Sequence, residues 1–199
     1  MVLFTLSKKI RSIFSLLTYL TAVSTCQAGD ANLEMTLSAN IVENTCQISV
    51  SDGGQVHLPT VGKGWFYNAD GSSRLAPTDA AAGTAFTINV ESCPEDNMTM
   101  NTLSFSFQPQ SGRWPTGSKQ VFINETPAIE SGADNVGIVI FSTAHHTNVL
   151  DSDGTSSVTI DIQNNARAAE YEFYARPQNT GPVSAGKITS NVLVSTIYN

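Results

Sequence analysis

Alternation of apolar and polar residues is the feature that most limits what this chain can fold into. Between residues 33 and 41 every second side chain is apolar, at Leu33, Met35, Leu37, Ala39 and Ile41. Because successive side chains of a β-strand point to opposite faces, this pattern predicts a strand over residues 32–42 with a continuous apolar face. No stretch shows the 3.6-residue periodicity of an amphipathic helix.

Further strands are predicted along the rest of the chain. The segments with strand-like patterns are 86–90, 103–107, 136–141, 158–162, 171–175 and 187–198. Turn-forming clusters such as Asp52-Gly53-Gly54 and Asp153-Gly154 separate them. Short strands with regular turns predict an all-β sandwich in a single domain. Residues 79–83 allow one helical turn at most, and residues 62–74 have the composition of a loop.

The first 28 residues have the features of a secretory signal peptide. Lys8, Lys9 and Arg11 precede an apolar segment, which ends at Cys26-Gln27-Ala28 with small residues suited to a signal peptidase. The apolar segment is shorter than the roughly 20 residues of a transmembrane helix. We therefore expect export of a mature chain that begins near Gly29. The alternative, lipidation of Cys26, is disfavoured by the residues before it.

The charge balance of the mature chain excludes some partners. After loss of residues 1–28, the chain has seven Lys and Arg residues and 17 Asp and Glu residues, a net charge of −10. Nucleic acids and anionic membranes are bound through basic patches, so neither is expected as a partner.

Two cysteines remain after the signal peptide, Cys46 and Cys93. An even number in an exported protein predicts a disulfide, which stabilises the fold by about 4 kcal/mol through the entropy of the unfolded chain. A free thiol pair or a metal site is the alternative, but neither cysteine has another Cys or a His at the spacing of metal ligands.

Several sequence features occur together in a fixed order along the mature chain. They are Asn44-Thr45-Cys46-Gln47-Ile48, Phe86-Thr87-Ile88 before Cys93, Val136-Gly137-Ile138, the segment Tyr171–Pro177, Gly186 fourteenth from the end, and the penultimate Tyr198. In this ordered set the chain resembles the chaperone–usher fimbrial subunits of the type 1 pilin-like group over nearly all of its mature length.

The resemblance implies an incomplete immunoglobulin-like sandwich that lacks its last strand and exposes a groove beside its C-terminal strand. Residues 29–44 would be an N-terminal donor-strand extension and residues 45–199 the pilin domain. The extension would insert into a neighbouring subunit's groove through Leu33, Met35, Leu37, Ala39 and Ile41, contributing up to roughly 8–12 kcal/mol before entropy costs. The family usually has glycine where this chain has Ala39.

The resemblance also implies the partners. Gly186, Val192, Val194 and Tyr198 would border the groove and contact a periplasmic pilus chaperone. Its further partners during assembly would be an outer-membrane usher and neighbouring fimbrial subunits. On the bacterial surface the fimbria would contribute to cell adhesion. The alternatives are a minor tip adaptor or adhesin that binds a host glycan, and a self-sufficient sandwich whose N-terminal strand folds into its own sheet.

Candidates for other chemistry are few. His145 and His146 are neighbours and so point in different directions, which predicts surface histidines rather than metal ligands. Asp151-x-Asp153-Gly154 lacks the further ligands of a calcium loop and predicts a β-turn. Trp65, Phe66 and Tyr67 offer a sugar contact, although anchoring of a loop is the favoured interpretation. No catalytic residues, cofactor or metal are expected.

Overall fold

Two β-sheets pack face to face in the part of the chain that the structure describes. The computed structural model describes residues 33–39, 46–81, 83–93, 101–162 and 170–198. Its strands are β1 Leu33–Ala39, β2 Gln47–Val50, β3 Gln55–Leu58, β4 Thr84–Ser92, β5 Thr102–Pro109, β6 Phe122–Ile123, β7 Val136–Ser142, β8 Val158–Asp161, β9 Glu170–Asn179 and β10 Ile188–Tyr198. The predicted signal peptide, residues 1–28, lies outside the described residues.

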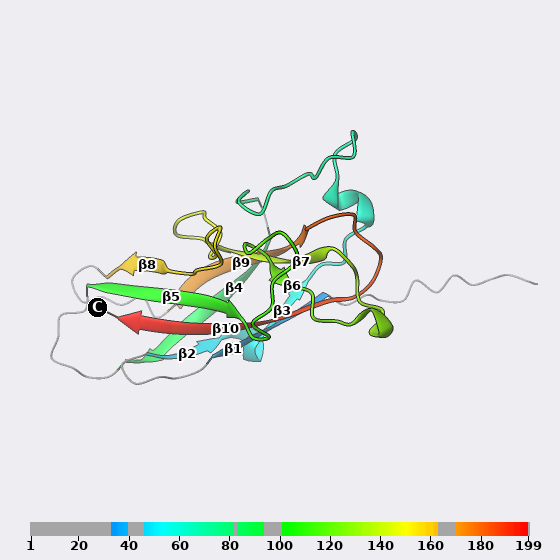
Figure 1. Cartoon of the computed structure of the whole chain (residues 1–199). Coiled ribbons are helices and arrows are strands. Elements are labelled where there is room, and N and C mark those ends of the chain that lie inside the picture. The colour runs from blue at the N-terminus through cyan, green and yellow to red at the C-terminus, as the bar shows by residue number, and fades with distance from the viewer. Residues whose placement is uncertain (1–32, 40–45, 82, 94–100, 163–169, 199) are drawn as a thin grey trace, which may run out of the picture. The chain divides into compact units, whose positions relative to one another are not determined.

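One sheet has the strand order β3-β1-β10-β5-β8, and the other has the order β2-β4-β9-β7-β6. All neighbouring strands are antiparallel except β1 and β10, which run in the same direction. Figure 1 shows β10 between β5 and β1 in the first sheet. The predicted all-β, immunoglobulin-like sandwich is confirmed.

Helical structure is confined to short 3₁₀ turns among the described residues: η1 Ser51–Gly54, η2 Lys63–Phe66 and η3 Ala128–Glu130. The described part of residues 79–83 forms no helix; instead, the Asp79 amide closes a turn by donating to the Ala76 carbonyl. No helix in the described ranges is long and apolar enough to cross a membrane.

The core lies between the sheets and is built from the alternating residues that the sequence pattern identified. Phe173 is its centre, and the ring contacts Phe86, Phe105 and Phe107 at centroid distances of 5.9, 5.5 and 5.1 Å. Every residue of β7 is buried, so this strand is covered on both faces. This explains why its sequence is a continuous apolar run rather than an alternating one.

Strand β9 is longer than its alternation predicted. The expected strand ends at Ala175 and is followed by Arg176-Pro177 and a turn, whereas β9 continues to Asn179. Its pairing with β4 stops at Ala175, and only β7 accompanies it further. Beyond Ala175, one edge of β9 pairs with no described strand. Pro177, which has no backbone N–H to donate, is tolerated there. The three polar residues in this extension, Arg176, Gln178 and Asn179, are all buried.

Candidate functional site: the groove beside β10

The N-terminal strand β1 lies in the molecule's own sheet, between β10 and β3. It pairs in parallel with β10 from Leu33 opposite Ile188 to Ala39 opposite Val194. On its other side it pairs with β3 over Leu33 to Thr36 only. β1 therefore occupies the place beside the C-terminal strand that the family resemblance implied to be open to a partner.

Side chains of β1 fill the sandwich core from this position. Met35 and Leu37 are buried, with 0% and 5% of their surfaces exposed, and Thr36 between them is half-buried. Two of the five predicted donor residues thus point into the core. Leu33 and Ala39 are placed only by their register opposite β10, and Ile41 lies outside the described residues.

We call the inward face of β10 the groove wall, and alternate buried residues form it. These are Ile188, Ser190, Val192, Val194 and Thr196. The predicted groove residues Val192 and Val194 are among them, and Tyr198 is half-buried opposite Leu103 of β5. The sequence pattern therefore placed the correct face of this strand toward the core.

Two hydroxyl groups in this apolar wall differ in their hydrogen bonding. Thr196 Oγ1 donates to the Cys46 carbonyl at 3.3 Å. The buried Ser190 Oγ has no hydrogen-bond partner in the described part of the chain. A buried polar group without a partner is destabilising. β1 therefore leaves one polar group of the groove wall, the Ser190 hydroxyl, without a hydrogen-bond partner.

Gly186 lies just before β10 and allows a close backbone approach. A Cβ atom there would lie 2.5 Å from the Ala133 nitrogen and 2.6 Å from the Ser131 carbonyl oxygen. The same approach lets Lys187 exchange backbone hydrogen bonds with this loop, donating to Ser131 and accepting from Ala133. Any larger residue would push the start of the groove wall away from the loop.

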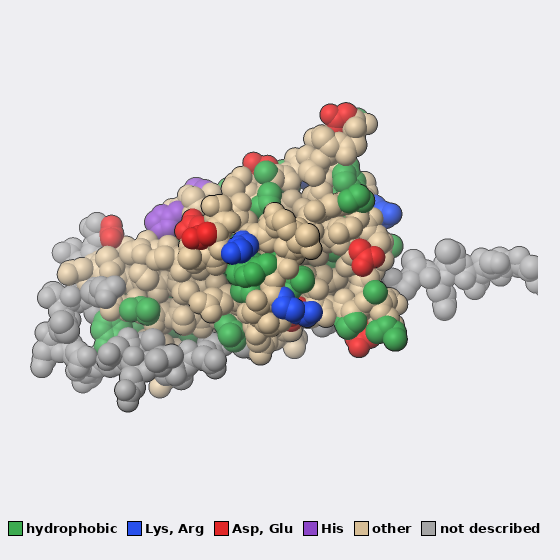
Figure 2. All heavy atoms as spheres, viewed as in Figure 1, with side chains coloured by type: hydrophobic (Ala, Val, Ile, Leu, Met, Phe, Trp, Pro, Cys, Tyr) green, Lys and Arg blue, Asp and Glu red, His purple; other side chains and the backbone are tan. Residues whose placement is uncertain are grey.

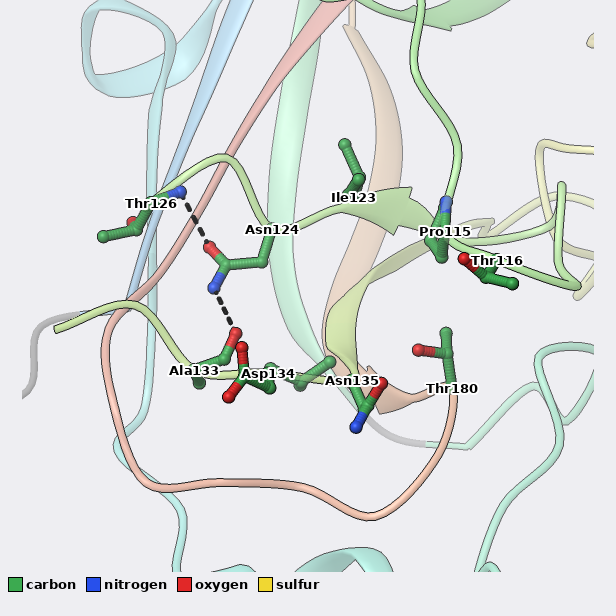
Figure 3. Close-up of a pocket in the computed structure, with 10 residues that line it drawn as sticks. Pro115, Thr116, Ile123, Asn124, Thr126, Ala133, Asp134, Asn135 and Thr180 are labelled. Carbon is green, nitrogen blue, oxygen red and sulfur yellow. Dashed lines mark hydrogen bonds between the residues drawn. The ribbon is translucent and has the colours of Figure 1, made fainter. Parts of the chain in front are cut away.

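Asn124 holds the same region together through its side chain (Figure 3). Its Nδ2 donates to the carbonyls of Ala133 and Lys187 at 2.8 and 2.9 Å. Its Oδ1 accepts from the amides of Thr126 and Thr189 at 3.1 and 2.9 Å. All four hydrogen-bonding positions of the amide are used. Periodicity could not reveal this residue, because it acts through backbone groups distant in sequence.

The predicted disulfide between Cys46 and Cys93 is present. It joins the residue before β2 to the residue after β4 in the second sheet. Because the Cys46 carbonyl also accepts the Thr196 hydroxyl, the disulfide lies near the C-terminal end of β10. Cys46, the first described residue after β1, is therefore fixed near that end of β10.

The aromatic group at residues 65–67 attaches a loop to the sandwich. Phe66 is buried, and the Tyr67 hydroxyl accepts from the Val183 amide at 2.8 Å and donates to the Gly181 carbonyl at 3.2 Å. Trp65 is half-buried under the Arg74 guanidinium, 4.8 Å from its ring centroid. These contacts favour the loop-anchoring interpretation over a sugar contact.

Buried Arg176 anchors the next part of this loop from β9. Its Nη2 donates to the carbonyls of Ala76 and Asp79 at 2.9 and 3.0 Å, and its guanidinium lies over the Phe141 ring. Burial lowers the pKa of the Arg176 side chain to about 10, against the opposing effect of Asp79. The group thus stays charged at neutral pH. Figure 1 shows the tip of this loop projecting beyond the sheets.

The remaining candidates lie on the surface. His145 and His146 are exposed, and His145 Nε2 is 2.9 Å from the Thr159 carbonyl oxygen. Asp153 Oδ1 accepts from the Thr155 amide and hydroxyl within a turn, and these bonds lower the pKa of Asp153. In the ranges that the structure covers, no three His, Cys, Asp or Glu side chains gather as metal ligands would.

Comparison with known sequences identifies the chain's relatives. Residues 33–199 match the family described as Fimbrial protein. The chain belongs to the fimbrial protein family. It is 35% identical over 178 residues to the fimbrial-like protein YadK of Escherichia coli (strain K12), covering 84% of this chain and 86% of that protein. It is 27% identical over 187 residues to the major fimbrial subunit SMF-1 of Stenotrophomonas maltophilia (strain K279a), covering 89% and 99%.

Family membership confirms the resemblance seen in the sequence and supports a structural role. This fimbrial protein is a subunit of a fimbria, a surface fibre in which it associates with other fimbrial subunits. Members of this family are structural proteins.

Proposed function

We propose that this fimbrial subunit is linked to its neighbours by donor-strand exchange, with residues 29–44 as the donor segment. The single observation that carries the proposal is that β1 fills the core beside β10 although only β10 pairs with it along its whole length. Met35 and Leu37 are buried as core residues, yet the short β3 covers only the first half of β1. A strand paired along its whole length on one side only can be replaced by an equivalent strand of another molecule.

The connection to Cys46 favours one direction for the molecule's own strand. Residues 40–45 join β1 to Cys46, which lies beside Thr196 near the C-terminal end of β10. Reversed in the same groove, β1 would place Ala39 opposite Ile188. That position is roughly 27 Å from Thr196 along the strand. The seven Cα–Cα steps from Ala39 to Cys46 reach about 25 Å at most.

A donor strand from another subunit has no such connection and is free to run antiparallel to β10. Antiparallel pairing is slightly more stable per residue than parallel pairing. Self-insertion and exchange therefore use one groove in two orientations. In this proposal Leu33, Met35, Leu37, Ala39 and Ile41 enter the neighbour's groove, beside Val192 and Val194.

Before any strand is inserted, the groove exposes an unpaired strand edge and an open core. Such an edge promotes aggregation. A periplasmic chaperone that occupies the groove next to Gly186, Val192, Val194 and Tyr198 fits this requirement, followed by transfer at an outer-membrane usher. Export through the periplasm by the predicted signal peptide belongs to the same proposal. We assign the subunit no catalytic activity, cofactor or metal.

Adhesion follows from display on the cell surface. A shaft subunit would contribute through the fibre, whereas a minor tip adaptor or adhesin would bind a host glycan at the fibre's end. Immunogold labelling of assembled fibres separates these roles, because a shaft subunit labels along the length and a tip subunit labels once.

Strand exchange is tested by separating the donor from the acceptor. A mature chain that lacks residues 29–42 is prepared and mixed with a peptide of residues 29–44, and complex formation is followed by native mass spectrometry and thermal unfolding. We expect the truncated chain to be unstable alone and to gain a one-to-one complex with a higher Tm.

The control peptide carries Leu37→Arg, which puts a charge at a position that is buried in β1. It should neither bind nor stabilise the truncated chain. A truncated chain as stable as the intact protein, with no response to either peptide, would overturn the groove assignment. Co-expression of the same variants with the cognate chaperone tests the periplasmic step separately.

A further inference from the structure

The second tryptophan, Trp114, lines a cleft on the outer face of the first sheet. The cleft has a volume of about 420 Å³, within the range of small-molecule sites and larger than two other clefts of about 230 and 190 Å³. Its lining includes Ser106 and Gln108 of β5, Gly112, Trp114, Gly154 and Ser156. The side chain of Trp114 is half-buried, so part of it faces the solvent.

The indole ring is held in place from behind. It packs on the core residue Phe122 with centroids 6.4 Å apart. On another side it contacts Gly154, where a Cβ atom would lie 3.0 Å from Trp114 Cζ2 and where φ is +88°. The glycine therefore admits both the turn and the close approach of the ring. Such support fixes the aromatic surface before any ligand arrives, which reduces the entropy lost on binding.

The polar groups that line the cleft are neutral, and most of them have no partner among the described residues. Neither the Gln108 amide nor the Ser106 hydroxyl nor the Trp114 indole N–H bonds to a protein group in the described ranges. Ser156 Oγ accepts the Phe107 amide at 2.9 Å and keeps its own hydrogen to donate. Together these groups supply donors and acceptors without a net charge.

We propose that this cleft binds a neutral saccharide. A sugar presents an apolar face of C–H groups, which suits an aromatic surface, and a rim of hydroxyls that both donate and accept. No charged side chain lines the cleft; the Lys and Arg side chains that Figure 2 shows on this face are not part of its lining. Those features favour an uncharged polyhydroxyl ligand over an anion or a basic peptide.

The position of the cleft is compatible with assembly. It lies over β5 and the turn before β8, whereas β1 is attached to the opposite edge of β10. The cleft therefore stays open whichever strand fills the groove. If the subunit repeats along a fibre as proposed, weak single sites would act together by avidity. That consequence rests on the proposed function, but binding by the isolated subunit does not.

The test uses tryptophan fluorescence of the mature monomer. The protein has two tryptophans, so a Trp65→Phe background makes Trp114 the sole reporter. This protein is titrated with glucose, galactose, mannose, N-acetylglucosamine, lactose and maltose, and ¹H–¹⁵N spectra are recorded in parallel. We expect a saturable change with at least one sugar and shifts that cluster around Ser106, Gln108 and Trp114.

Gln108→Ala removes one hydrogen-bonding side chain without touching the core, because Gln108 is exposed. It should weaken binding about tenfold, the equivalent of one hydrogen bond. Gln47→Ala, an exposed glutamine on β2 in the other sheet, is the matched control and should bind as the parent does. No saturable response to any sugar, or equal loss in both variants, would overturn the proposal. Strand exchange, measured with the truncated chain and peptide, would be unaffected by either result.

Discussion

Met35 lies directly opposite Ser190 in the parallel ladder between β1 and β10, and both side chains are buried. In the proposed assembly cycle, Met35 belongs to the donor strand, which is exchanged, and Ser190 belongs to β10, which stays in place. The pairing of Met35 with Ser190 also distinguishes the two directions in which the strand could run. In a reversed strand of the same extent, Met35 would not lie opposite Ser190.

A cysteine at each of these positions should lock the strand in its own groove. In Met35→Cys/Ser190→Cys we expect a second disulfide, because directly paired residues on neighbouring strands have Cα atoms within disulfide range. The locked monomer should fail to assemble until a reductant is added. Peptide mapping by mass spectrometry verifies the pairing, and Met35→Cys alone is the control. A locked variant that still assembles without reductant would contradict exchange through this groove.

The two inward hydroxyls of β10 should respond in opposite directions to removal. Ser190→Ala deletes a buried hydroxyl with no partner and should stabilise the monomer by about 1 kcal/mol. Thr196→Val deletes the bond to the Cys46 carbonyl and should destabilise it by a similar amount. Urea unfolding of both variants measures the difference. Destabilisation by Ser190→Ala would mean that this hydroxyl is hydrogen-bonded in solution.

Gly186→Ala should destabilise the subunit by about 2–3 kcal/mol. The added methyl group meets backbone atoms of residues 131–133, which cannot move aside as a flexible side chain would. Gly64→Ala is a suitable control, since a Cβ there has no atom within 4 Å. Thermal unfolding of the two variants compares them directly. Equal stability would show that the loop relaxes around the methyl group.

Replacement of Arg176 by methionine should loosen one loop while changing global stability by only about 1 kcal/mol. The substitution removes a costly buried charge as well as its bonds to the Ala76 and Asp79 carbonyls, and these effects oppose each other. Hydrogen exchange should rise in residues 75–81 and stay unchanged in β7. Arg113→Met, at an exposed position outside this loop, is the control. Unchanged exchange in the loop would mean that other contacts hold it.

The alternating segments allowed the sheets and the buried face of β10 to be predicted, because burial on one side of a strand imposes a two-residue period. The extension of β9 through Pro177 was missed, because it depends on where the neighbouring strand β4 ends, and the local sequence of β9 does not contain that information. Asn124 and Arg176 were missed for a related reason. Both hold backbone carbonyls that lie far away in sequence, and hydrophobic periodicity carries no trace of such bonds.

The aromatic residues show the same limit in another form. Trp65, Phe66 and Tyr67 drew notice because they are consecutive, yet the structure uses them to attach a loop. Trp114 stands alone between turn-forming residues and gave no signal in the sequence. Its setting depends on Gly154, forty residues later, whose missing side chain leaves room for the ring.

The short connection between β1 and Cys46 has a kinetic consequence. A strand attached through six residues is present at its own groove at an effective concentration in the millimolar range. Closure on itself is a first-order event, whereas joining another molecule depends on how many are nearby. A released subunit in dilute solution would therefore close before it met a neighbour. Fibre growth would then require that subunits reach the growing end without ever being free.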